Sequence, residues 1–164
     1  MPIYLIRHGQ SWANAGDKTI IDPPLTILGR QQAADISLTV DLVICSPMRR
    51  ALETYHYSNI ISPLYIIIRE FREKICEIGD SMLLEKYIPE KREAFYLRIK
   101  TMANYLLEYN IKHENIAVVC HGCVISSLTG IKPNNGDIIM ADNNILSQIA
   151  AGGIIDAPCC NVTW

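Results

Sequence analysis

The chain has 164 residues, of which 49% are hydrophobic, and its formal net charge is −2. A chain of this length buries enough surface to stabilise a core without disulfides or metal ions, so we predict a single domain over residues 1–164. A nearly balanced charge offers no general attraction to polyanions, which argues against a nucleic-acid-binding protein. Any anion site must therefore be built locally from a few arginines.

The cysteines and the first residues bear on the cellular compartment. Six cysteines could form a disulfide framework, but the chain is larger than the small secreted scaffolds that depend on one. The apolar stretch 3–6 stops at Arg7, far short of the apolar core of a signal peptide or of a membrane span. We expect a cytoplasmic protein with no membrane partner.

Four short apolar runs, rich in β-branched residues, predict strands that are buried on both faces of a sheet. These runs are residues 3–6, 42–45, 64–68 and 116–120. Polar segments with helical spacing lie between the runs, at 29–38, at 48–56 and around 93–108. One face of the last helix is predicted to be apolar and carries Phe95, Ile99, Met102, Ala103 and Leu106.

Strands that alternate with helices predict an α/β fold, here a three-layer α/β/α sandwich with a mostly parallel central sheet. After Gly130 the pattern is weaker, with turns predicted at 133–136 and 152–153. We interpret residues 132–164 as edge strands and loops. The apolar pieces of this region lie around Ile138, Ile145 and Val162.

Two histidines follow predicted strands directly. His8 stands in the sequence Arg7-His8-Gly9, and His121 is likewise followed by a glycine. The carboxyl ends of parallel strands meet at one edge of the sheet, where ligands bind. A single histidine after a strand is more often structural, but two at the same edge, with an arginine beside one of them, favour a site.

A third strand end adds positive charge. The segment 45–51 places Arg49 and Arg50 at the start of a predicted helix. Arginine side chains match phosphate oxygens in a bidentate manner, and the N-terminus of a helix adds backbone donors. Alone, these arginines would equally fit a solvated helix start. Together with the histidines they indicate a phosphate site.

Four ordered motifs resemble those of the histidine phosphatase superfamily, branch 1, whose members are phosphoglycerate mutase-like. The motifs lie in residues 5–14, 25–33, 46–54 and 118–122, and the resemblance extends from Ile3 to about Thr129. The resemblance implies a phosphoglycerate mutase-like fold and a reaction that requires no metal or other cofactor.

The resemblance also implies roles for particular residues. His8 would be the nucleophile and would form a phosphohistidine, with His121 as the second catalytic histidine. Arg7, Arg50 and His121 would bind the phosphoryl oxygens, and Asn14 would add a neutral donor. The arginine that aligns with the family's is Arg50, which leaves Arg49 as a surface neighbour.

The leaving group also needs a proton, which a carboxylic acid supplies. In the family this acid follows an apolar residue and one further residue, a pattern that Phe71-Arg72-Glu73 fits. We therefore expect Glu73 to be the proton donor. Glu70, Glu77 and Asp80 lie close enough in sequence to compete, although an exposed loop charge is the commoner role for such residues.

Two other features admit alternative interpretations. Cys120 and Cys123 form a Cys-x-x-Cys pair that could serve redox chemistry or zinc binding. A buried strand that ends beside a His-Gly motif produces the same spacing, and we favour that interpretation. Cys45 and Cys76 are expected to be small core residues. Trp12 could line the pocket or cover its rim.

The predicted function is a phosphatase that hydrolyses a phosphomonoester, either a small phosphorylated substrate or a phosphopeptide. One alternative is a phosphoglycerate mutase, in which the phosphohistidine returns its phosphate to the sugar acid. Another is a catalytically silent module that recognises phosphate. The segment after Glu73 is short for a mutase of this family, which favours hydrolysis. The sequence leaves the physiological substrate and the oligomeric state open.

Overall fold

The computed structural model describes residues 1–81 and 88–154. Its centre is a five-stranded sheet with the order β5-β3-β6-β1-β7. The strands are β1 (Ile3–Arg7), β3 (Leu42–Cys45), β5 (Leu64–Ile67), β6 (Ile116–Cys120) and β7 (Ile138–Met140). All neighbouring strands run parallel except β7, which is antiparallel to β1. The predicted mostly parallel sheet is confirmed.

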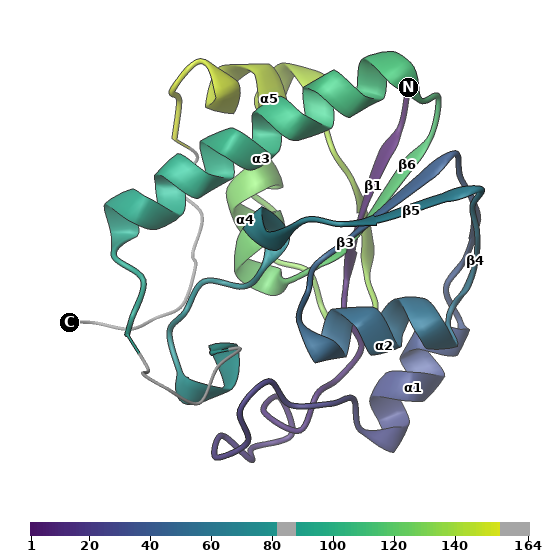
Figure 1. The fold of residues 1–164 in the computed structure, drawn as a ribbon, viewed down its shortest axis with the longest axis vertical. Helices are drawn as coiled ribbons and strands as arrows, with labels where there is room; N and C mark the ends of the chain where they lie inside the picture. The colour runs from purple at the N-terminus through teal and green to yellow at the C-terminus, as the bar shows by residue number, and fades with distance from the viewer. Residues whose placement is uncertain (82–87, 155–164) are drawn as a thin grey trace.

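Helices cover both faces of this sheet, as predicted (Figure 1). Strand side chains on one face of the sheet, such as those of Leu5 and Val118, form a core with α3 (Arg92–Lys112), α4 (Gly122–Thr129) and α5 (Asn143–Ala150). Side chains on the opposite face, such as those of Ile6 and Val119, pack against α2 (Arg49–Tyr57). The helix α1 (Ile27–Ala34) packs beside α2. Because side chains alternate along each strand, one continuous apolar run supplies both cores.

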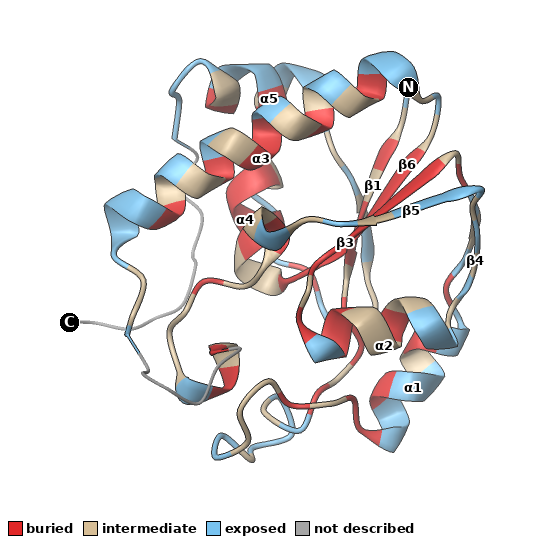
Figure 2. Ribbon diagram, in the orientation of Figure 1, coloured by how far each residue is buried: buried red, intermediate tan, exposed pale blue. Residues whose placement is uncertain are grey.

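The strand predicted at 64–68 exists, but the prediction that it is buried on both faces is wrong. Among the described strands, β5 pairs with β3 alone and lies at the edge of the sheet. Its Leu64 is 49% exposed and its Ile67 is 52% exposed, and Figure 2 shows β5 mostly exposed where the neighbouring β3 is buried. An apolar run reports strand propensity, whereas burial depends on the place of the strand in the sheet.

The helix predicted at 29–38 ends early. α1 closes at Ala34, and Ser37–Thr39 forms the strand β2, which pairs in parallel with β4 (Asn59–Ile61). From Ile36 to Val40 buried or partly buried side chains alternate with exposed ones. This period of two is typical of a strand and competes with the helical interpretation. The helix around 93–108 is confirmed as α3, and its predicted apolar face is buried.

In the region after Gly130, the prediction of edge strands and loops is confirmed in one place and wrong in another. Ile138 begins the edge strand β7, as predicted, after a turn at residues 135–136. Ile145 instead lies in the helix α5, so the edge-strand or loop prediction is wrong there. Asp142 caps this helix by accepting hydrogen bonds from the backbone N–H groups of Asn144 and Ile145. Val162 lies outside the described residues.

Two short 3₁₀ turns follow β5, η1 (Arg69–Phe71) and η2 (Ile78–Asp80). They carry the chain from the edge of the sheet toward the carboxyl ends of the central strands. Within residues 1–81 and 88–154, no helix combines the length and the apolar character that a membrane span needs.

Candidate active site

The carboxyl ends of three parallel strands bring the predicted site residues together. β1 leads into His8, β3 into Ser46 and β6 into His121. The backbone N–H of His8 donates to the carbonyl of Cys120, and that of Ser46 donates to the carbonyl of Val119. These bonds fix the relative positions of the first residues beyond the three strands.

A cavity of about 210 Å³ opens at this edge of the sheet. It is lined by Arg7, His8, Ser11, Ala13, Asn14, Lys18, Arg50, Glu73, Glu77 and Asp80. Five of the six predicted site residues therefore line one cavity. The sixth, His121, is fully buried beneath it, and its ring centroid lies 5.1 Å from that of His8 in an edge-to-face arrangement.

The hydrogen bonds of His8 define its tautomer. Its Nδ1 lies 2.7 Å from the carbonyl oxygen of Gly9, which can only accept, so Nδ1 carries the proton. Its Nε2 accepts from the Nε of Arg50 at 3.1 Å. Burial, followed by the positive charge of Arg50, lowers the pKa of His8 well below 6.5. His8 is therefore a neutral imidazole at neutral pH, with its lone pair on Nε2.

His121 is held by a residue that the sequence did not single out as functional. The hydroxyl of Ser46 lies 2.7 Å from Nε2 of His121. Burial and then Arg50 lower the pKa of His121 well below 6.5. Its Nδ1 is buried without a hydrogen-bond partner among the described residues. The position of Ser46 directly after β3 was the available signal, because that place meets the other strand ends.

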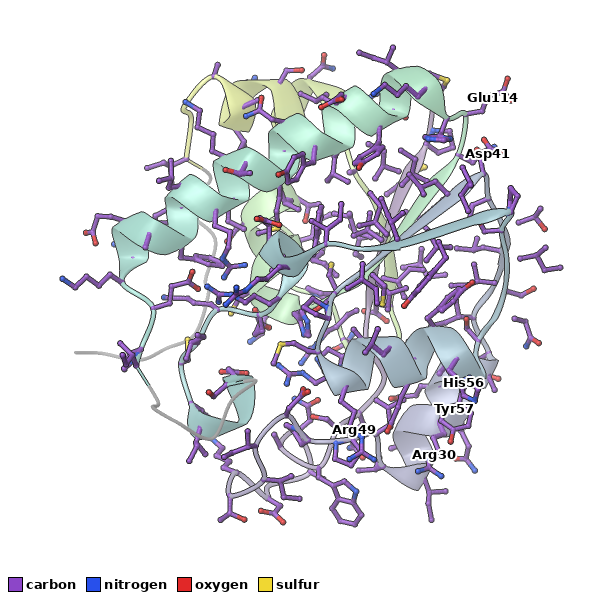
Figure 3. All side chains as sticks on the ribbon, in the orientation of Figure 1. Arg30, Asp41, Arg49, His56, Tyr57 and Glu114 are labelled. Carbon is purple, nitrogen blue, oxygen red and sulfur yellow. The ribbon has the colours of Figure 1, made fainter. Side chains whose placement is uncertain are left out.

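The two neighbouring arginines occupy different environments. The side chain of Arg50 is 4% exposed and donates to His8, to the carbonyl of Gly79 at 3.1 Å and to Asp80 at 3.0 Å. The side chain of Arg49 is 58% exposed and pairs with Glu53 one helical turn later. Figure 3 shows Arg49 at the start of α2. Only Arg50 can therefore act inside the cavity.

Arg7 approaches the cavity from the end of β1. Its Nη1 donates to the carbonyl of Pro133 at 2.8 Å, and its buried Nε has no hydrogen-bond partner among the described residues. Burial lowers the pKa of Arg7, while Glu73 opposes this shift. The absent side chain of Gly122 leaves the space that the guanidinium fills, since a Cβ there would lie 3.3 Å from Nε. An unpartnered donor beside a cavity is suited to an anionic ligand.

Asn14 is oriented by residues that the sequence analysis missed. Its Oδ1 accepts from the backbone N–H of Ser11 at 3.1 Å, from the hydroxyl of Ser11 at 3.0 Å and from the amide of Asn135 at 3.2 Å. Asn135 also donates to the carbonyl of His8 at 3.0 Å. Because these contacts occupy the oxygen, the amide nitrogen of Asn14 is the group that can donate to a ligand.

The structure places the four candidate proton donors in different environments. Glu73, Glu77 and Asp80 line the cavity, whereas Glu70 does not. Glu77 forms an exposed ion pair with Lys18, and Asp80 pairs with Arg50. No ion pair of Glu73 is found within the described residues.

The carboxylate of Glu73 accepts backbone N–H bonds from Lys74 at 2.9 Å and from Cys123 at 3.3 Å. Burial and then the negative charge of Asp80 raise its pKa, against the opposing effect of Arg50. A raised pKa keeps a carboxylic acid protonated at higher pH, which a proton donor requires.

Further residues hold the loop that carries His8. The backbone N–H of Gly9 donates to the hydroxyl of Thr54, which itself donates to the carbonyl of Arg50. The backbone N–H of Gln10 donates to the side chain of Gln32 at 2.8 Å. Thr54 and Gln32 lie inside the helical motifs quoted for the family resemblance, yet neither was singled out.

The cysteines of the strands are buried. Burial raises the pKa of the Cys45 thiol to about 12 and also raises that of the Cys120 thiol. Reactive cysteines have lowered pKa values, so these two are suited to packing. Cys76 is only partly buried, so the expectation that it is a core residue is not met. Trp12 is 47% exposed and is not among the residues that line the cavity.

Comparison with known proteins identifies a matching family profile and similar folds. Residues 3–78 match the sequence profile of the histidine phosphatase superfamily (branch 1). The crystal structure of the α-ribazole phosphatase from Shigella flexneri is 26% identical, with a TM-score of 0.66 over 87% of this chain and 90% of that one. A phosphoglycerate mutase from Thermus thermophilus is 21% identical, with a TM-score of 0.64 over 87% of this chain and 93% of that one.

A curated human relative is much longer than this chain. The 6-phosphofructo-2-kinase/fructose-2,6-bisphosphatase 4 of Homo sapiens is 26% identical, and the match covers 77% of this chain but 31% of the human protein. These findings confirm the predicted resemblance to the histidine phosphatase superfamily, branch 1, and the phosphoglycerate mutase-like fold. The α-ribazole phosphatase match supports an enzyme of this general kind, and the mutase match, at 21% identity, shows the fold alone.

Proposed function

We propose that this protein is a phosphatase that hydrolyses a phosphomonoester through a phosphohistidine on His8. The observation that carries the proposal is the neutral state of His8 with its Nε2 lone pair beside the Arg50 guanidinium, in a cavity that Arg7 also lines. A neutral imidazole is a nucleophile, and the adjacent guanidinium can hold a phosphoryl group in front of it.

The first step is attack of His8 Nε2 on phosphorus, in line with the leaving oxygen. The P–N bond forms as the P–O bond to the leaving group breaks. Arg7, Arg50 and Asn14 donate hydrogen bonds to the phosphoryl oxygens, and His121 supports the site from below. Glu73 gives its proton to the leaving oxygen, so that a neutral alcohol departs.

The second step releases phosphate. Glu73, now a carboxylate, takes a proton from a water molecule that attacks phosphorus. The P–N bond breaks, inorganic phosphate forms, and His8 returns to its neutral state. The matched α-ribazole phosphatase has a similar fold, and its alignment covers most of both chains, which supports hydrolysis as the overall reaction.

The test is phosphate release from p-nitrophenyl phosphate by the purified protein. We expect His8→Ala to lose more than about a thousandfold in kcat/KM, because the nucleophile is gone. His56→Ala, on the exposed side of α2 (Figure 3), is the matched control and should retain wild-type activity. Rapid quenching should trap an acid-labile phosphoenzyme in the wild type and not in His8→Ala.

Two outcomes would contradict the proposal. Unchanged turnover in His8→Ala would remove His8 as the nucleophile. If phosphate bound but no ester were hydrolysed and no phosphoenzyme formed, a silent phosphate-binding module would be the better description. Rapid interconversion of 2- and 3-phosphoglycerate, far above the rate of hydrolysis, would instead indicate the mutase.

A further inference from the structure

An ion pair forms part of the cavity lining and has no role in the proposed chemistry. The Nζ of Lys18 lies 2.6 Å from Oε1 of Glu77, and their side chains are 61% and 43% exposed. Both residues line the same cavity as His8. Lys18 belongs to the loop after β1, whereas Glu77 precedes η2, so the pair joins two segments that are distant in sequence.

The position of this pair is coupled to that of the nucleophile. Glu77 and Asp80 cap each other reciprocally at η2, with each side chain accepting the other's backbone N–H. Asp80 pairs with Arg50, and Arg50 donates to His8. A continuous series of contacts therefore runs from His8 to Lys18. Any group that the Lys18–Glu77 pair binds is held in a defined place relative to the attacking nitrogen.

The charges of the lining determine which ligand groups are tolerated beyond the phosphoryl group. Arg7 and Arg50 are the guanidinium groups available for phosphate, and three carboxylates share the remaining wall with Lys18. A second anion on the substrate would have to compete with Glu77 for Lys18 or with Asp80 for Arg50. Among the lining residues that the structure describes, the His8 imidazole is the one aromatic ring, and Ala13 is the one apolar side chain. The described lining, which is mostly polar with its exposed charges already paired, therefore suits a neutral polar group beside the phosphoryl group.

The pair itself offers both kinds of hydrogen bond. The Lys18 ammonium has three N–H donors, of which Glu77 takes one, and the Glu77 carboxylate only accepts. A hydroxyl group can accept from the ammonium and donate to the carboxylate. Two hydroxyls on adjacent carbons suit a donor and an acceptor that already lie within hydrogen-bond distance of each other.

Resting on the proposed phosphatase function, we infer that Lys18 and Glu77 bind neighbouring hydroxyl groups of the leaving group. The substrate is then the phosphate ester of a small polyol or sugar. Sugar acids, bisphosphates and phosphopeptides with anionic neighbours are poorer substrates. Lys18 and Glu77 contact the leaving group and take no part in the transfer of the phosphoryl group.

The test compares esters that differ only in their hydroxyl groups. The first pair is glycerol 3-phosphate and n-propyl phosphate, and the second is ribose 5-phosphate and 2-deoxyribose 5-phosphate. We expect the wild-type kcat/KM to favour the hydroxylated member of at least one pair by tenfold or more. Lys18→Met and Glu77→Gln should each reduce this ratio at least fivefold, mainly through KM.

The control variants change a second exposed ion pair, which lies on α3. Lys112 and Glu108 pair at 2.9 Å with side chains 59% and 62% exposed, and neither lines the cavity. Lys112→Met and Glu108→Gln should leave the ratio at its wild-type value. A wild-type ratio near one for both ester pairs would overturn the inference. So would a ratio that Lys18→Met and Glu77→Gln leave unaltered.

Failure of the proposed function is separable from failure of this inference. If the wild type releases no phosphate from any ester, calorimetric titration of the same four esters measures binding without turnover. Tighter binding of the hydroxylated esters that Lys18→Met abolishes would support the Lys18–Glu77 subsite while the phosphatase proposal fails. Equal binding of the hydroxylated and deoxygenated esters would overturn the subsite.

Discussion

The Nε of Arg50 donates a hydrogen bond to Nε2 of His8 at 3.1 Å. This contact involves the nitrogen that would attack phosphorus, so it both marks that nitrogen as unprotonated and places a positive charge beside it. The two terminal nitrogens of the same guanidinium bind Gly79 and Asp80. Arg50 therefore orients the nucleophile from α2 and connects it to the segment around η2.

Replacing Arg50 by lysine tests this arrangement. Arg50→Lys keeps the positive charge but loses the planar guanidinium that reaches three partners at once. We expect kcat/KM for p-nitrophenyl phosphate to fall about a hundredfold to a thousandfold, comparable to the loss of one transition-state donor in other enzymes. Steady-state kinetics at neutral pH measures the effect.

The neighbouring residue provides the control for this substitution. Arg49→Lys changes an exposed side chain that pairs with Glu53 and does not line the cavity. Its kcat/KM should stay within twofold of the wild type. Equal losses in Arg50→Lys and Arg49→Lys would show that the charge of the helix start matters and the geometry of Arg50 does not.

Glu73→Gln tests the proton donor. Glutamine keeps the shape of the side chain but cannot give up a proton, so esters with poor leaving groups should lose about a hundredfold in kcat. p-Nitrophenyl phosphate, whose leaving group needs little protonation, should lose far less. Since the pKa of Glu73 is raised, wild-type activity should fall as pH rises through that pKa, and this descending limb should be absent in Glu73→Gln.

Glu70→Gln serves as the comparison, because Glu70 does not line the cavity. It should preserve both the leaving-group dependence and the descending limb of the pH profile. If Glu73→Gln instead kept the wild-type profile, Asp80 would be the next candidate, since it also lines the cavity with a raised pKa.

The site residues that could be predicted are those that directly follow a predicted strand. His8 and His121 each follow an apolar run, and parallel strands must bring such positions to one edge. The segment that carries Glu73, Glu77 and Asp80 could be predicted only as a set of competing carboxylates. Which of them is ion-paired depends on contacts with Lys18 and Arg50, which lie far away in sequence.

In the fold, too, features with a local sequence pattern could be predicted, whereas features that depend on contacts distant in sequence could not. The α3 face from Phe95 to Leu106 was predictable because its spacing is repeated over several turns. The end of α1 at Ala34 and the helical state of Ile145 were not predictable in this way. α1 is followed by a strand that exists because β4 pairs with it, and α5 depends on packing against α3. Tertiary contacts decide such short elements.

The buried histidines make the folded protein sensitive to acid. The pKa values of His8 and His121 lie below 6.5 in the folded state, so below pH 6.5 the unfolded chain binds protons that the folded chain does not. The free energy of unfolding should therefore fall as pH falls, by up to about 1.4 kcal/mol per pH unit for each histidine. The loss ends when pH passes below the folded pKa values.

Urea unfolding between pH 7.5 and pH 5 measures this slope. Glu73 acts in the opposite sense, because its raised pKa lets the folded state bind an extra proton, so the series is best run in a Glu73→Gln background. Adding His8→Gln and His121→Gln should flatten the slope, whereas adding the exposed His56→Gln should not. A slope that survives loss of both buried histidines would contradict their assignment as its source.

The close contact between the nucleophile loop and α1 depends on glycine. A Cβ on Gly29 would lie 2.0 Å from the carbonyl oxygen of Gln10, and a Cβ on Gly9 would lie 2.2 Å from the carbonyl oxygen of Gly29. Both clashes are with backbone atoms, which cannot move aside without shifting the helix. Gly29→Ala should therefore separate α1 from the loop that carries His8.

We expect Gly29→Ala to lower the free energy of unfolding by about 3 kcal/mol, at the upper end of the usual cost of overpacking. The same change should reduce kcat/KM more than tenfold, because the Gln10 backbone and the side chain of Gln32 no longer align at 2.8 Å. Gln31→Ala, an exposed position two residues later, should stay within about 0.5 kcal/mol of the wild type. If Gly29→Ala unfolded at the wild-type urea concentration and kept wild-type kinetics, the contact between α1 and the loop would not position the nucleophile.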